Sequence, residues 1–188
     1  MRVLSSTAAR GFSFIELLVA VLVIVLLIGV VTLNVGRGGA DVQLRQEVEY
    51  LASLFSYARD EAGFTSSDYG LFIGLESRDD RERYRGLWLR RFDQGWAPPM
   101  ATGEAFSPIS FAENTELYMQ LDGQPDVAIA FYDPELNPSP QVIFWAGGEV
   151  TPGSLDWHDA HSGSLLYRME WDLLGRLALF PRGISDED

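Results

Sequence analysis

One uninterrupted apolar run near the amino terminus restricts the fold of this chain more than any other feature. From Leu17 to Val31 every residue is apolar or glycine. A helix over residues 12–33 would be about 33 Å long, enough to cross a hydrocarbon core of about 30 Å. The residues before it are polar, with Arg2 and Arg10 and no acid, which favours a cytoplasmic amino terminus. The sequence therefore predicts a single membrane-spanning helix, with everything after residue 40 on the far side.

A carboxylate stands at the edge of this run, where ionised groups are costly. Glu16 directly precedes the run, and a charge in the membrane costs roughly 2.5 to 3.5 kcal/mol even on lenient insertion scales. A secretory signal peptide, with Gly38 and Ala40 before its cleavage point, has no use for that charge. Cutting between Gly11 and Phe12 would instead create an α-amino group four residues upstream, on the same chain or on a neighbouring subunit. Pairing with this amine would offset the desolvation of both charges.

The residues around Glu16 carry a family resemblance. Residues 11–18, Gly-Phe-Ser-Phe-Ile-Glu-Leu-Leu, resemble the type IV pilin and pseudopilin signal, in which a prepilin peptidase cuts after the glycine and methylates the new amino-terminal phenylalanine. The matching positions are Gly11, Phe12 and Glu16, the fifth residue of the mature chain. The resemblance implies that Glu16 pairs with the amine of an adjacent subunit during filament assembly. It also implies a filament-core helix that includes Leu17, Leu18, Val21 and Ile24.

A glycine-rich segment separates the apolar run from a second helical pattern. Three glycines in four positions weaken a helix by about 1 kcal/mol each relative to alanine, so residues 34–40 are predicted to form a break or a flexible joint. Asp41 suits an N-cap. From there apolar residues recur at steps of four and three, which predicts a helix over residues 41–62 with one apolar stripe. The stripe packs on the sheet of its own domain or forms a coiled-coil face.

After residue 68 the pattern changes to short stretches rich in aromatic and β-branched residues and separated by turn residues. They predict one antiparallel sheet over residues 69–180 that wraps the carboxyl-terminal half of the long helix, an α+β, pilin-like fold. The arginine and acid run at residues 77–83 is predicted to be a solvated loop between the first two strands. The predicted strands are residues 69–76, 84–92, 127–132, 141–145, 165–171 and 177–180.

A finer resemblance covers most of the remaining chain. Residues 51–62, residues 140–152 with their Gly-Gly-Glu-Val-Thr-Pro turn, and Leu-Gly-Arg at 174–176 resemble the H-type minor pseudopilins of type II secretion. Residues 133–140 and the acidic tail 185–188 have no part in this pattern. Because minor pilins of type IV pili commonly carry a carboxyl-terminal disulfide, the absence of cysteine favours secretion over a pilus.

This resemblance implies a structural subunit near the tip of the pseudopilus, a filament that supports export of folded proteins across the outer membrane. The implied partners are prepilin peptidase, the I-, J- and K-type minor pseudopilins, the major pseudopilin and the inner-membrane secretion platform. The implied location is the bacterial inner membrane, with a periplasmic carboxyl-terminal domain of residues 41–188 and a leader peptide of residues 1–11.

The charge balance argues against nucleic-acid binding. The chain has 14 basic and 27 acidic residues and a net charge of -13, so a phosphate backbone would be repelled over most of the surface. Loss of residues 1–11, with two arginines, would bring the mature chain to about -15.

Catalysis and metal binding have little support in the sequence. His158 and His161, with flanking aspartates, could bind a metal, but the segment 156–161 is predicted to be a solvated acidic loop. Residues 121–126 could offer oxygens to Ca²⁺, yet they lack the spacing of a dedicated calcium loop. The sequence therefore predicts no enzyme and no cofactor.

Two other functions stay open at this point. One is a minor pilin of a type IV pilus, acting in assembly, adhesion or DNA uptake, which a groove of exposed Trp88, Trp96 and Trp157 would support. The other is a membrane-anchored periplasmic enzyme whose metal is held by His158 and His161.

Overall fold

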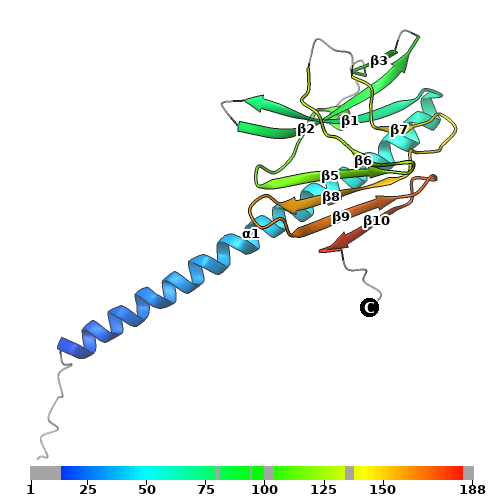
Figure 1. The fold of residues 1–188 in the computed structure, drawn as a ribbon. Helices are drawn as coiled ribbons and strands as arrows, with labels where there is room; N and C mark the ends of the chain where they lie inside the picture. Colours follow the sequence, from blue (N-terminus) through cyan, green and yellow to red (C-terminus); the bar gives the residue numbers. More distant parts are fainter. Residues whose placement is uncertain (1–13, 79–80, 94, 100–103, 134–137, 184–188) are drawn as a thin grey trace, which may run out of the picture. The chain divides into compact units, whose positions relative to one another are not determined.

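The computed structural model describes residues 14–78, 81–93, 95–99, 104–133 and 138–183; of these, the side chains of residues 27–38, 40, 78 and 125–126 are not described. The chain divides into two compact units, an amino-terminal unit of residues 1–43 and a globular unit of residues 44–188. Helix α1, Phe14–Thr65, contributes residues to both units (Figure 1).

Helix α1 corrects two details of the prediction. It continues through residues 34–40, so no break occurs there, and Asp41 lies inside the helix instead of capping it. Once a helix is nucleated, each further residue adds a hydrogen bond, so a short weak segment between two good helical sequences stays helical. A flexible joint at residues 34–40 stays a prediction.

The end of α1 follows from a turn that satisfies its last carbonyl groups. The helix ends at Thr65, three residues later than predicted. Ser66 has a φ of 50°, and the amide of Ser67 donates to the carbonyl of Ala62 at 3.2 Å. A left-handed residue followed by such a bond is a common helix stop.

Within its described residues, the globular unit contains two five-stranded sheets in place of the single predicted sheet. The first sheet has the order β3-β2-β1-β7, with β4 also paired to β2, and the second has the order β10-β9-β8-β5-β6. All neighbouring strands within both sheets are antiparallel, as predicted. The first sheet consists of β1 (Tyr69–Arg78), β2 (Arg81–Phe92), β3 (Gly95–Ala97), β4 (Ile109–Ser110) and β7 (Val142–Phe144). The second consists of β5 (Thr115–Leu121), β6 (Gln124–Val127), β8 (Gly153–Asp159), β9 (Leu165–Trp171) and β10 (Leu177–Pro181), and a short 3-10 helix covers Glu104–Phe106.

Five of the six predicted strands are present, and one is wrong. In the predicted strand 127–132, only Val127 belongs to a strand, and Phe131 forms a single parallel bridge with Leu75. Three strands of the second sheet, β5, β6 and β8, were not predicted, and neither were the short strands β3 and β4 of the first. The predicted solvated loop at 77–83 is instead largely strand, because β1 and β2 continue to the pair Arg78 and Arg81; residues 79–80 lie outside the described part.

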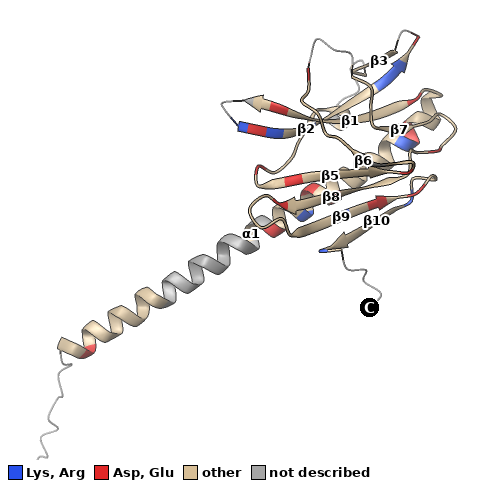
Figure 2. Cartoon of the chain, viewed as in Figure 1, with Lys and Arg blue, Asp and Glu red and all other residues tan. Residues whose placement is uncertain are grey.

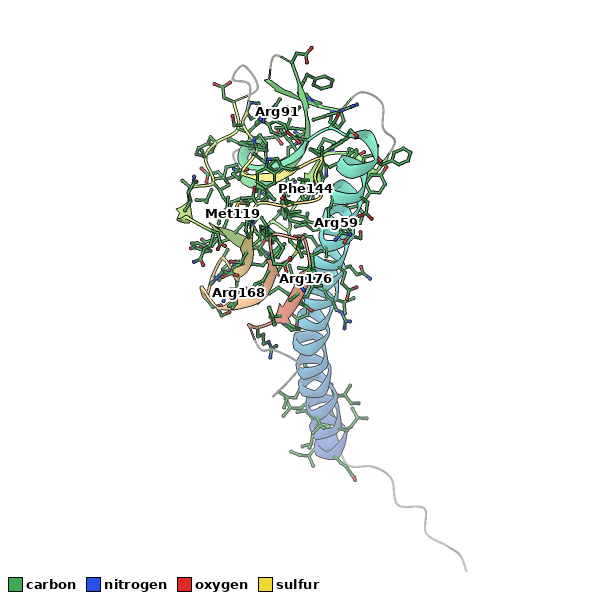
Figure 3. All side chains as sticks on the ribbon, turned by 90° about the vertical axis from the view of Figure 1, so that its right-hand side faces the viewer. Arg59, Arg91, Met119, Phe144, Arg168 and Arg176 are labelled. Carbon is green, nitrogen blue, oxygen red and sulfur yellow. The ribbon has the colours of Figure 1, made fainter. Side chains whose placement is uncertain are left out.

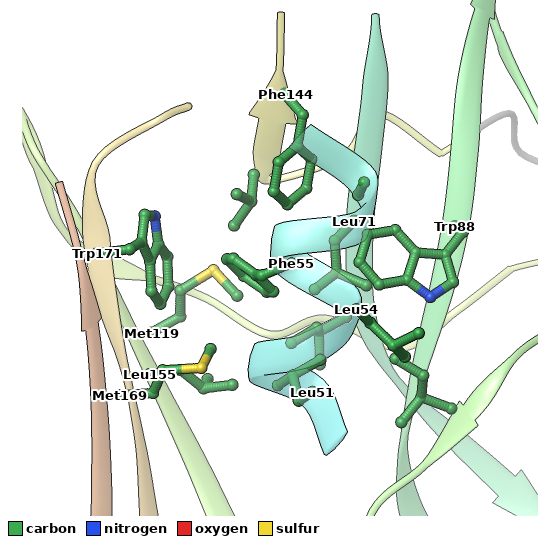
Figure 4. Packing of buried hydrophobic residues seen from close by; sticks show 14 of the residues in the cluster. Leu51, Leu54, Phe55, Leu71, Trp88, Met119, Phe144, Leu155, Met169 and Trp171 are labelled. Carbon is green, nitrogen blue, oxygen red and sulfur yellow. The ribbon is translucent and has the colours of Figure 1, made fainter. Parts of the chain in front are cut away.

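The apolar stripe of α1 packs on its own domain, as the first of the two alternatives predicted. Figure 4 shows this part of the helix between the two sheets, with Phe55 directed toward side chains from both. The Phe55 ring lies 4.9 Å from that of Trp171 in the second sheet and 5.1 Å from that of Phe144 in the first. The two sheets therefore share one core built on the helix. Its buried helix residues are Leu44, Val48, Leu51, Leu54, Phe55, Ala58 and Ala62.

Candidate assembly site

The described start of α1 is an apolar surface that contains one acid. The large apolar side chains between Phe14 and Leu26 are 47 to 81% exposed, and Glu16 is the charged residue among them (Figure 2). A carboxylate in the first turn also interacts favourably with the positive end of the helix dipole. An exposed apolar surface of this extent must be shielded from water, either by lipid or by other apolar helices.

The predicted filament-core residues all lie on this surface. Leu17, Val21 and Ile24 follow one another at steps of four and three, so they share one face of α1, and Leu18 lies beside them. These four side chains are 51 to 59% exposed. They are therefore available for packing against another helix.

The processing site and part of the predicted membrane span lie outside the described residues. Gly11 and Phe12 belong to residues 1–13, and the side chains of residues 27–33 are not described either. The described residues contain no helix with both the length and the hydropathy needed to span a bilayer. Cleavage after Gly11 and a span over residues 12–33 stay predictions.

In the globular unit, the carboxylate of Glu47 fastens α1 to the second sheet. It accepts a hydrogen bond from the indole of Trp157 in β8 and another from the amide of Ala112, both at 2.9 Å. Burial raises the pKa of Glu47 above 4.5, although the two hydrogen bonds act in the opposite direction. The sequence did not single out Glu47, because its two partners lie 65 and 110 residues away.

Truncating Glu47 is expected to destabilise the globular unit. A Glu47→Ala variant leaves the buried indole N–H of Trp157 without its acceptor, which costs about 1–3 kcal/mol in the free energy of unfolding. Glu47→Gln keeps one acceptor oxygen and removes the half-buried charge, so we expect a loss below about 1 kcal/mol. Urea denaturation of the purified protein measures the loss for both variants.

Glu49→Ala is the control, because it removes the exposed ion pair with Arg45 and leaves Glu47 in place. It is expected to cost less than about 1 kcal/mol. Equal losses at residues 47 and 49 would contradict the expectation.

The raised pKa of Glu47 also makes the stability of the folded chain depend on pH. Because the pKa of Glu47 is raised in the folded chain, the folded state binds its proton more tightly than the unfolded state does. The stabilisation that comes from this proton is therefore complete below the pKa that Glu47 has in the unfolded chain. It is lost as the pH rises through the pKa that Glu47 has in the folded chain. We expect the stability of the wild type relative to Glu47→Gln to decrease as the pH rises above about 4, measured by urea denaturation at each pH.

The two predicted metal candidates lie at and just beyond the carboxyl-terminal end of β8, near its turn to β9. The ring Nδ1 of His158 donates to the carbonyl of Gly163 at 3.0 Å, and the backbone amide of His161 donates to the carboxylate of Asp159 at 3.1 Å. Hydrogen bonds from Ser162 lower the pKa of Asp159. In the part of the chain that the structure describes, no three His, Asp or Glu side chains are grouped to hold a metal ion.

The prediction that residues 156–161 form a solvated loop is wrong for its first half. Asp156 and Trp157 belong to β8, and Trp157 is fully buried. The guanidinium of Arg168, on the adjacent strand β9, donates to both oxygens of Asp156 at 2.7 and 2.6 Å. This paired contact explains how a carboxylate that is only 6% exposed is tolerated in a strand. Figure 3 places Arg168 far from Arg91 of the first sheet.

The proposed calcium segment is a hairpin turn. Leu121 of β5 pairs with Gln124 of β6, so Asp122 and Gly123 form a two-residue turn. Gly123 has a φ of 81°, which glycine adopts without strain. The amide of Asp122 donates to the carbonyl of Pro152 at 3.0 Å, and this bond fixes the turn against the segment before β8.

The groove of exposed tryptophans that would support an adhesin is absent from the described residues. Trp88 and Trp157 are buried in the core. Trp96 is half-buried, and the guanidinium of Arg91 lies 5.6 Å from the centre of its ring. The prediction of exposure was therefore wrong for Trp88 and Trp157, because β2 and β8 both direct these side chains toward α1.

Known proteins resemble this chain in sequence and in fold. No family model matches it. The type II secretion system protein H of Pseudomonas aeruginosa is 33% identical over an alignment of 151 residues, and the match covers 77% of this chain and 80% of that protein.

Three solved structures share the fold at lower sequence identity. Two structures of the minor pseudopilin EpsH from the type II secretion system of Vibrio cholerae superpose with TM-scores of 0.61 and 0.58 at 21% identity, covering 78 and 76% of this chain and 99% of theirs. The solution structure of Escherichia coli GspH superposes with a TM-score of 0.54 at 18% identity, covering 76% of this chain and 91% of that one. Because the similarity to the Pseudomonas aeruginosa protein extends over most of both sequences, the chain belongs to the type II secretion system protein H family.

Proposed function

We propose that this chain is a minor pseudopilin, a structural subunit of the type II secretion pseudopilus close to its tip. The observation that carries the proposal is the exposed apolar face of α1 with Glu16 in its first turn, found in a member of the protein H family. Such a face suits storage in a membrane followed by packing into a helical bundle. The role is structural, so it requires no catalytic group and no cofactor.

The chemistry of assembly follows from the residues at the amino terminus. Residues 1–11 and the apolar run hold the precursor in the inner membrane, with its amino terminus in the cytoplasm and residues 41–188 in the periplasm. Prepilin peptidase cuts between Gly11 and Phe12 and methylates the new amino group. This cation then pairs with Glu16 of a neighbouring subunit, which sets the register at which the apolar helices pack.

The proposed partners are other pseudopilus subunits. The I-, J- and K-type minor pseudopilins lie above this subunit at the tip, the major pseudopilin forms the shaft below it, and the inner-membrane platform assembles the filament. The filament in turn supports export of folded proteins across the outer membrane.

Blocking the cleavage site tests this proposal. We expect a Gly11→Val variant to stay in the membrane as the full-length precursor, because a branched side chain at the cut position excludes it from the peptidase, and to reduce export to the level of a strain without the gene. Mass spectrometry of the amino terminus and an assay of secreted protein measure the two effects.

A substitution of the same kind elsewhere in the leader gives the control. Ala9→Val enlarges a side chain two residues before the cut and is expected to be processed and to restore export. A wild-type chain whose mature amino terminus is residue 41, as after a secretory signal peptide, would refute the proposal.

A further inference from the structure

Three turns meet at one end of the second sheet, on the right in Figure 1. They are the β5–β6 turn at Asp122 and Gly123, the segment before β8, and the β9–β10 turn at residues 172–176. Backbone hydrogen bonds connect them, from Asp122 to Pro152 at 3.0 Å and from Val150 to Leu173 at 2.8 Å. The guanidinium of Arg59 on α1 also donates to the carbonyl of Leu174 at 3.4 Å. This end of the sheet is therefore tied together and to the helix.

A groove of about 720 Å³ crosses the outer face of the sheet beside these turns. Gln120, Ser154, Glu170 and Ala178 form one cross-strand row through β5, β8, β9 and β10, and all four line the groove. Ser154 and Ala178 are small, which leaves the space open, while Asp122, Leu173 and Arg176 line it at the turns.

The β9–β10 turn presents two leucines in a fixed conformation. Leu173 and Leu174 are 51 and 57% exposed. The carboxylate of Asp172 accepts the amides of Leu174 at 3.0 Å and Arg176 at 2.9 Å, and Gly175 adopts a φ of 68°. An apolar tip held in one conformation loses little entropy on binding, so it suits docking of a partner.

The charges that line the groove indicate the chemistry of its occupant. Three carboxylates line it, those of Asp122, Glu170 and Asp172, against one guanidinium. That guanidinium, of Arg176, is already engaged by Asp172 at 2.6 Å. Glu170 lies 3.9 Å from the guanidinium of Arg168, but Arg168 donates to both oxygens of Asp156, so one negative charge of that group is not balanced. The remaining negative charge complements a lysine or arginine, whose aliphatic part can lie along the leucines while its head reaches the carboxylates.

We propose that this groove, together with Leu173 and Leu174, binds a segment of a neighbouring, different pseudopilus subunit that carries apolar residues and at least one lysine or arginine. The identity of the partner rests on the proposed function. A second copy of this chain is the poorer occupant, because two chains with a net charge of -13 each repel one another. The contact gives specificity to a filament in which the apolar helices alone would pack with any subunit.

Photo-cross-linking in cells tests the contact with the full chain. A photoreactive phenylalanine analogue replaces Leu174 in a strain that carries the other secretion genes. We expect a cross-link to a different pseudopilus subunit, at a peptide that contains lysine or arginine. The same analogue at Phe131, which is equally exposed at 58% but lies outside the groove, is expected to give no such product. A product formed only with a second copy of this chain, or formed equally from residue 131, would overturn the proposal.

Charge reversal tests the role of the carboxylates. Asp122→Lys combined with Glu170→Lys is expected to reduce the cross-linked fraction about tenfold, which corresponds to about 1.4 kcal/mol of binding free energy. Glu82→Lys combined with Asp93→Lys makes the same change of charge on the first sheet and is expected to leave the fraction unchanged. An equal effect of the two pairs would attribute the loss to net charge and exclude the groove.

Filling the groove separates this inference from the proposed function. Ala178→Trp adds bulk at an exposed position of the edge strand β10 without touching the core, and it is expected to lower both the cross-link and export. Circular dichroism verifies its fold, and Leu173→Ser with Leu174→Ser provides a second test. If the wild type restores export and these variants do so equally well, the groove has no role while the pseudopilin function stands. If the wild type fails to restore export, the proposed function itself is wrong.

Discussion

A Glu16→Leu variant is expected to be cleaved after Gly11 and to reach the membrane like the wild type, but to be missing from pseudopili. The substitution removes the proposed partner of the new amino group, so that cation would be buried alone during packing of the helices. At a separation of about 4 Å and an effective dielectric constant of about 20, the lost attraction is on the order of 4 kcal/mol. That corresponds to roughly a thousandfold weaker association of subunits.

Fractionation of sheared pseudopili, together with a secretion assay, measures this effect. Glu16→Gln is expected to fail similarly, because it keeps the shape of the side chain without the charge. Ser13→Leu makes the segment more apolar to a similar degree but leaves the acid in place, and it is expected to assemble. If Glu16→Leu were found in pseudopili at the wild-type level and restored export, charge pairing would have no part in assembly.

The largest expected effect on stability is that of Phe55→Ala. The Phe55 ring contacts Phe144 and Trp171 from opposite sheets, and Trp88 lies 6.5 Å away. Truncation leaves a cavity at the point where α1 and both sheets meet, and a buried phenylalanine replaced by alanine costs about 3–5 kcal/mol. Urea denaturation followed by near-ultraviolet circular dichroism measures the loss.

Phe64→Ala serves as the control for Phe55→Ala on the same helix. Phe64 is 88% exposed, so its truncation is expected to change the free energy of unfolding by less than about 0.5 kcal/mol. Because alanine is the better helix former, helix propensity cannot account for a loss at either position. Equal losses would mean that the packing of Phe55 between the two sheets does not set the stability of this region.

The sequence predicted those helices and strands that bury one face, because their apolar residues repeat at a regular spacing. The stripe on α1 and five strands were found because their apolar residues repeat at the period of the structure they form. Strand β5 could have been found in the same way: in Thr-Glu-Leu-Tyr-Met-Gln-Leu the residues at alternate positions are buried. Strand β8 is harder, because Asp156 is tolerated only through Arg168, 12 residues further along the chain.

The rest of the fold could not be predicted, because it depends on which strands pair with one another across long distances in the sequence. The sequence offers strands but does not state which of them pair, so two sheets were predicted as one. Residues 127–132 have strand-forming side chains, yet beyond Val127 only the bridge from Phe131 to Leu75 joins them to a sheet.

The candidate sites also differ in whether their residues are close together in the sequence. Gly11, Phe12 and Glu16 could be proposed from the sequence because they lie within one short motif, and their roles stay predictions. The groove was not, because its residues come from four strands and three turns that approach one another only in the folded chain.

The sharing of one helix by two sheets has a mechanical consequence for a filament subunit. In the globular unit, α1 is attached to the first sheet through Phe55 and Phe144 and to the second through Phe55, Trp171 and Glu47. A pull along the helix axis therefore loads these contacts in parallel and in shear, so many must rupture together. We expect the subunit to resist tension along that axis better than a force that peels either sheet away.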